Sequence, residues 1–86
     1  MNEQAEERSV LARIEQCAGE VLEALTGVEE INILRLAEYL GERSVLTYQA
    51  LGWLAREGKI RYRRSGSQVF VALAGELKAN HDDKNP

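Results

Sequence analysis

The feature that most constrains this chain is a change of apolar spacing at Gly58. Before this glycine, one set of residues recurs at three- and four-residue steps, which is typical of the buried face of a helix. These residues are Thr47, Ala50, Leu51 and Leu54. After it, two short runs alternate with a period of two around a Ser-Gly-Ser turn, which indicates a β-hairpin. A helix leading directly into a hairpin is how a winged helix-turn-helix domain ends.

The predicted hairpin pairs residues 59–64 with 69–73. Gly66, in the Arg64-Ser65-Gly66-Ser67 tip, is free to take a positive φ. Alternation assigns the residues of each strand to opposite faces. The inward residues are Ile60, Tyr62, Val69, Val71 and Leu73. The outward residues are Lys59, Arg61, Arg63, Phe70 and Ala72.

Upstream of this helix the sequence predicts a second, shorter helix over 33–40. Asn32 is suited to cap its first turn, and Gly41 to end it. Ser44 is then the expected N-cap of the third helix. Only Glu42 and Arg43 separate the two helices, which is the spacing of a helix-turn-helix.

The first predicted helix covers residues 4–26 and ends at Gly27. Its apolar residues form two adjacent stripes. They are Val10, Ile14, Cys17 and Val21 in one stripe and Leu11, Ala18, Leu22 and Leu25 in the other. Both stripes facing one core is the favoured interpretation, and the alternative is that one of them covers a partner.

These elements, with a short strand over 28–31, predict an α+β fold with three helices and a C-terminal hairpin wing. We expect one domain over residues 1–75 and a polar, disordered tail over 76–86. The predicted core contains Leu36, Leu40, Leu51, Leu54, Ile60, Tyr62, Val69 and Val71.

Charge is divided unevenly along the chain. Residues 1–30 carry eight Glu against two Arg, whereas residues 31–75 carry seven Lys or Arg against three Glu. The pI of about 5.2 argues against strong nucleic-acid binding overall, but a local basic patch remains. The acidic start is unlike a signal peptide, no apolar run reaches membrane length, and the one cysteine precludes an intrachain disulfide. A cytoplasmic protein with no membrane partner is expected.

The run Leu51-Gly52-Trp53-Leu54-Ala55-Arg56-Glu57-Gly58-Lys59-Ile60 resembles a small bacterial winged helix-turn-helix domain family of unknown function. The resemblance extends over residues 14–73. It implies a winged-helix fold and brings no established activity, since any DNA-binding role of the family rests on analogy of fold.

No pattern in the sequence predicts catalysis. The single histidine, His81, lies in the tail, and no aspartate precedes Asp82. Cys17 is expected to be a small buried apolar residue. We therefore expect no enzyme activity, cofactor, metal or small-molecule substrate.

The leading hypothesis is a DNA-associated transcriptional regulator that acts as a homodimer. The third helix would enter the major groove, where Gln49 and Arg56 have the chemistry to contact adenine and guanine edges. The candidate phosphate contacts are Arg43, Lys59, Arg61, Arg63 and Arg64. The equally weighted alternative is that Arg61 and Arg63 form the solvated face of an edge hairpin.

A competing hypothesis is a protein–protein interaction or dimerisation module that binds no nucleic acid. Val45, Gly52 and Trp53 would supply a smooth apolar surface, and tryptophan is common at interface hot spots. Packing of Trp53 within its own chain is the favoured interpretation of that residue.

Overall fold

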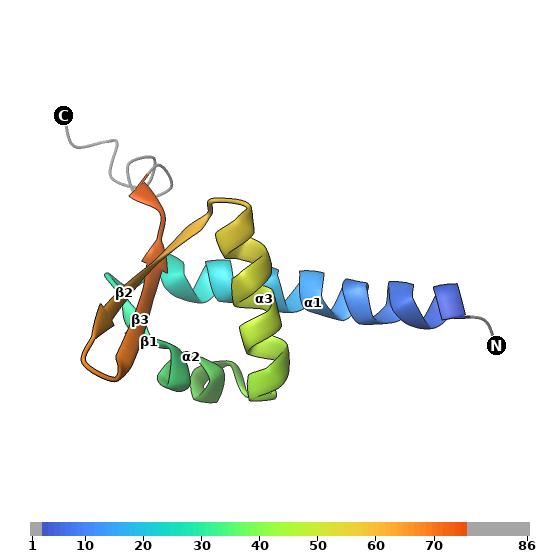
Figure 1. Ribbon diagram of the computed structural model, residues 1–86, viewed down its shortest axis with the longest axis horizontal. Coiled ribbons are helices and arrows are strands. Elements are labelled where there is room, and N and C mark those ends of the chain that lie inside the picture. Colours follow the sequence, from blue (N-terminus) through green and yellow to red (C-terminus); the bar gives the residue numbers. More distant parts are fainter. Residues whose placement is uncertain (1–2, 76–86) are drawn as a thin grey trace.

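A computed structural model describes residues 3–75 and shows a helix-turn-helix followed by a β-hairpin wing (Figure 1). The predicted α+β winged-helix fold is confirmed. The predicted tail, 76–86, lies outside the described residues, so the domain boundary stays a prediction. The elements are α1 (Glu3–Thr26), β1 (Ile31–Asn32), α2 (Ile33–Leu40), α3 (Ser44–Arg56), β2 (Ile60–Ser65) and β3 (Gln68–Leu73).

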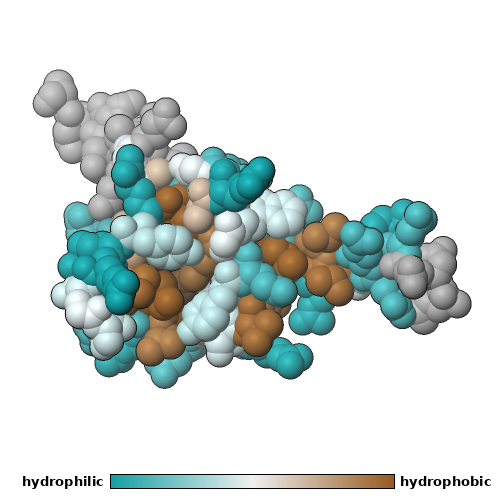
Figure 2. All heavy atoms as spheres, viewed as in Figure 1, coloured by the Kyte–Doolittle hydropathy of each residue, from teal (hydrophilic) through white to brown (hydrophobic). Residues whose placement is uncertain are grey.

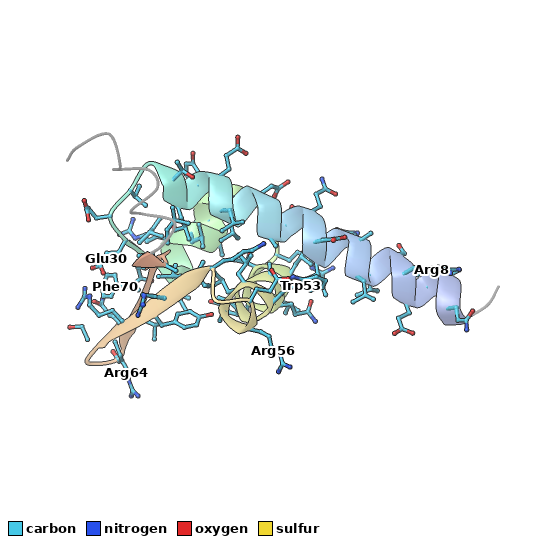
Figure 3. The ribbon with its side chains drawn as sticks, turned by 90° about the horizontal axis from the view of Figure 1, so that it is seen from above. Arg8, Glu30, Trp53, Arg56, Arg64 and Phe70 are labelled. Atoms are coloured by element: carbon cyan, nitrogen blue, oxygen red, sulfur yellow. The ribbon has the colours of Figure 1, made fainter. Side chains whose placement is uncertain are left out.

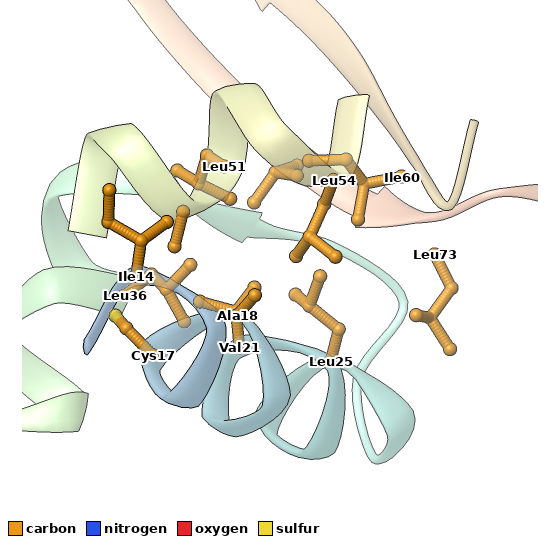
Figure 4. Close-up of a cluster of buried hydrophobic side chains, with 12 residues drawn as sticks. Ile14, Cys17, Ala18, Val21, Leu25, Leu36, Leu51, Leu54, Ile60 and Leu73 are labelled. Carbon is orange, nitrogen blue, oxygen red and sulfur yellow. The ribbon is translucent and has the colours of Figure 1, made fainter. Parts of the chain in front are cut away.

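The core lies where α3 crosses the C-terminal half of α1 (Figure 4). Leu36 of α2 and three residues of the hairpin close this core from the other sides. Both stripes of α1 contribute, as expected, but only from Ile14 onward, since Leu11 is exposed and Val10, beside the start of α3, is exposed as well. The core cluster consists of Ile14, Cys17, Ala18, Val21, Leu25, Leu36, Ala50, Leu51, Leu54, Ile60, Val71 and Leu73.

The turn between α2 and α3 is set by its capping residues. The N–H of Leu34 donates to Oδ1 of Asn32 at 2.8 Å, and Gly41 ends α2 with φ at +68°. The predicted cap at Ser44 is wrong. Ser44 is already helical, and Arg43 is the N-cap residue without a side-chain cap. The carbonyl of Arg43 accepts from the N–H of Thr47 and so opens α3 one residue earlier.

We expect Asn32→Ala to lower the free energy of unfolding by about 1 kcal/mol, because an N–H in the first turn of α2 loses its acceptor. Chemical denaturation measures this loss. Asn32→Asp keeps an acceptor oxygen and serves as the control. Equal losses in both variants would contradict the capping role.

The sheet has the strand order β1-β3-β2, and both pairings are antiparallel. On the edge strand β2, the inward face is buried at Ile60, at the base of the hairpin, but not at Tyr62, which lies closer to the tip. Tyr62 on the edge strand β2 is paired with Val71 on the central strand β3, yet Val71 is fully buried and Tyr62 is 49% exposed. The predicted core placement of Tyr62 is therefore wrong, and Val69 and Leu40 are only half-buried.

Candidate nucleic-acid interface

One face of α3 is exposed along its length among residues 3–75. Val45, Gln49, Gly52 and Arg56 are all exposed, as the helical period predicts, so Gln49 and Arg56 lie on one side two turns apart. Trp53, at the margin of this face, is half-buried against the core. This partial burial agrees with packing of Trp53 within its own chain, and its place in a protein interface stays a prediction.

Two arginines from separate elements project to the same side of the molecule. Figure 3 shows Arg56 of α3 and Arg64 of the wing pointing away from α1. Within residues 3–75, Arg56 forms no ion pair, and Arg64 forms only a long hydrogen bond from Nε to the carbonyl of Gly66 at 3.4 Å. Both guanidinium groups are thus available to an anionic ligand on that side.

Tyrosines line the space between α3 and the wing. Tyr48 and Tyr62 border a shallow apolar groove together with Ile33, Leu51 and Val69. Partial burial raises the pKa of Tyr62, so its phenol stays neutral and can donate a hydrogen bond. The sequence hypothesis missed both tyrosines as surface residues. For Tyr48, its position three residues after Val45 and four before Gly52 was a signal that could have placed it on the exposed face.

On the outward face of the wing, Arg63 is ion-paired, unlike Arg56 and Arg64 within the described residues. Its guanidinium donates to both carboxylate oxygens of Glu30, with Nε 2.9 Å from Oε1, and it stacks on Phe70 with Cζ 4.5 Å from the ring centroid. The hydrogen bonds that Arg63 donates to Glu30 raise the pKa of Arg63. The guanidinium of Arg63 is therefore paired with the carboxylate of Glu30. The sequence did not predict this ion pair because the two residues are 33 positions apart.

The remaining basic candidates differ in their surroundings. Nζ of Lys59 lies 3.4 Å from Oε1 of Glu57 in an exposed pair. Arg61 is exposed on the outward face and forms no ion pair among the described residues. Arg43 lies at the opposite end of α3 from Arg56, beside α1. The structure thus brings Arg56 and Arg64 to one side of the molecule, whereas alternation along β2 points Arg61 to the opposite face of the hairpin from Arg64, and Arg43 lies at the other end of α3.

Cys17 is a core residue, as expected. It is 1% exposed, and burial raises the pKa of its thiol. Among residues 3–75, no three His, Cys, Asp or Glu side chains are grouped closely enough to hold a metal ion. No helix in the same part of the chain is long and apolar enough to span a membrane.

The fold and the exposed face of α3 define a winged helix-turn-helix domain. The chain belongs to the family described as winged helix-turn-helix domain (DUF2582), whose profile matches residues 6–73. No curated protein matches the chain.

Solved structures of similar fold include two HlyU proteins. HlyU from Vibrio cholerae N16961 has a TM-score of 0.67 at 24% identity, covering 98% of this chain and 94% of that one. The transcriptional regulator HlyU from Vibrio vulnificus CMCP6 has a TM-score of 0.62 at 24% identity, with coverages of 95% and 92%. The homodimeric winged helix-turn-helix DNA-binding domain Mb0332 from Mycobacterium bovis has a TM-score of 0.65 at 21% identity, with coverages of 93% and 78%. At these identities the likeness concerns the fold.

Proposed function

We propose that this protein is a cytoplasmic, non-enzymatic transcriptional regulator that binds duplex DNA as a homodimer. One observation carries the proposal: Arg56 of α3 and Arg64 of the wing project to the same side and are not held by carboxylates among the described residues. A major groove about 12 Å wide admits a helix such as α3. The resemblance in fold to the transcriptional regulator HlyU and to the DNA-binding domain Mb0332 supports the proposal.

Each side chain has a distinct role in the proposed complex. Gln49 and Arg56 face base edges, where an amide suits adenine and a guanidinium suits guanine. Arg64 contacts a phosphate beside the groove, and Lys59 and Arg61 contact phosphates from the outward face of the hairpin. Tyr48 and Tyr62 lie between these two sets and offer phenol groups to the DNA backbone.

A second candidate function is contact with another protein through Val45, Gly52 and Trp53. It is favoured by a shallow, largely apolar depression lined by Gly52, Trp53, Arg56 and Glu57. Since Trp53 is already half-buried in its own chain, it offers only part of its ring to a partner.

Titration of a random-sequence duplex at low salt tests the first candidate against the second. We expect binding that weakens linearly on a log–log plot against salt, since phosphate contacts release counterions. Fluorescence anisotropy with a labelled duplex gives both the affinity and the slope. No binding at low salt would remove the DNA proposal and leave the protein-contact candidate.

The ion pair between Arg63 and Glu30 gives a further expectation. We predict that Glu30→Gln increases affinity for duplex DNA and steepens the salt slope by about 1, because it releases one cation for a phosphate. Arg63→Gln should weaken binding less than Arg64→Gln does, since Arg63 is already occupied. Glu23→Gln on α1 makes the same charge change away from the wing and is the control. An equal gain in DNA affinity in the Glu23 variant would mean that the change in net charge, and not the release of Arg63, causes the gain.

A further inference from the structure

The first half of α1 is exposed along its length among the residues that the structure describes. Residues 4–13 are all exposed, including Val10 at 53% and Leu11 at 43%, and burial starts only at Ile14. Figure 1 shows this half projecting beyond the rest of the domain. A helical segment shorter than about 12–15 residues is marginally stable in water unless one of its faces is packed. The exposed apolar residues therefore mark a face that is available for packing.

A groove lies directly beside this projecting segment, where α1 leaves α3. Its floor is apolar and its rim carries two arginines. The lining residues are Val10, Arg13, Arg43, Val45, Leu46 and Gln49. Figure 2 shows hydrophobic side chains along the same stretch, on α1 and at the start of α3. Among residues 3–75, neither Arg13 nor Arg43 forms an ion pair.

The start of α1 has the complementary chemistry. Glu6 and Glu7 lie one helical turn before Val10, and Arg13 lies one turn after it on the same face. An amphipathic segment with an acidic beginning fits a groove with an apolar floor and a basic rim. The same chain thus carries both halves of a self-complementary surface.

We propose that the groove receives the start of α1 from a second copy of this chain, in a two-fold dimer with antiparallel α1 helices. With Val10 near the two-fold axis, Glu7 of each copy lies opposite Arg13 of the other. Glu6 of each copy approaches Arg43 of the other. Every contact occurs twice, as an isologous interface requires.

Duplex DNA fits this groove less well than a second copy does. Phosphates would meet the apolar floor made by Val10, Val45 and Leu46, whereas a helix buries that floor. The proposal therefore transfers Arg43 from the candidate phosphate contacts to a protein interface. It rests on the homodimer of the proposed function and names its interface, and its tests use the protein without DNA, so that their failure is distinguishable from a failure of DNA binding.

Charge reversal followed by mixing tests this interface. We expect the wild-type chain to dimerise, with a dissociation constant that rises with salt. In E6K/E7K the groove and its ligand are both basic, and in R13E/R43E both are acidic. Each variant alone should therefore dimerise about 100-fold more weakly, since like charges meet at two symmetric sites. An equimolar mixture should form a heterodimer, because each variant supplies the charge that the other lacks.

Sedimentation velocity across a concentration series measures the monomer–dimer equilibrium of the wild type, of each variant and of the mixture. E15K/E38K reverses two exposed carboxylates outside the groove and should dimerise as the wild type does. Val10→Asp should weaken the dimer without charge reversal at the rim, and circular dichroism checks that each variant is folded. A monomeric wild type, unchanged dimerisation of either charge variant, or a mixture that stays monomeric would overturn the proposal.

Discussion

Leu54→Ala is expected to lower the free energy of unfolding by about 2–5 kcal/mol, the range for truncating a buried leucine. Leu54 is 2% exposed and belongs to the cluster in which α3, α1 and the hairpin meet. The alanine variant loses apolar burial and leaves a cavity that helices on two sides prevent from collapsing. Urea denaturation measures the change as a shift of the midpoint at constant slope.

Leu34→Ala is the matched control because it removes the same atoms from a leucine that is 62% exposed on α2. We expect it to change the free energy of unfolding by less than about 0.5 kcal/mol. A loss in Leu54→Ala no larger than that of the control would contradict the placement of α3 against α1.

R56E/R64E is expected to lower affinity for duplex DNA by about 100-fold, as one guanine-reading side chain and one phosphate contact are lost. The reversed charges then repel the backbone. The slope of log affinity against log salt should also become shallower by about 1, because one phosphate contact fewer releases its counterion. Anisotropy titrations of one duplex at several salt concentrations measure both quantities.

Single variants separate a local effect from net charge. Arg8→Glu makes the same change of charge as Arg64→Glu, but Arg8 lies on the projecting part of α1, far from the wing (Figure 3). We expect Arg64→Glu to weaken binding about 10-fold and Arg8→Glu to leave it nearly unchanged. Equal losses in the two variants would mean that overall charge governs binding, and the proposed interface would be wrong.

The order of elements was predictable because each has a local signal. Apolar spacing marked the three helices, and Asn32 and Gly41 marked the ends of α2. Gly66 takes φ at +61° in the hairpin tip, as the Ser-Gly-Ser turn suggested. The error at Ser44 amounts to one residue. The signal identified a capping residue type but not which backbone carbonyl accepts the first helical hydrogen bond.

The candidate interface was predictable only in part. Helical period placed Gln49 and Arg56 on the exposed face of α3, because a helix fixes the direction of its own side chains. The commitment of Arg63 to Glu30 joins β2 to the residue just before β1, and no local pattern reports a contact over that separation. Alternation likewise placed Tyr62 on the inner face without revealing that the strand carrying it lies at the edge of the sheet.

By itself, the sequence determined which residues form helices and strands and which face of each is apolar, since these properties depend on neighbours within a few positions. Only the tertiary structure decided how far each apolar face is covered. It left Val10, Leu11 and Tyr62 exposed. It also placed Arg63 of the wing within hydrogen-bonding distance of Glu30, which is distant in sequence. The burial of an apolar face depends on where the other elements lie in space. The spacing of apolar residues along one element does not predict those positions.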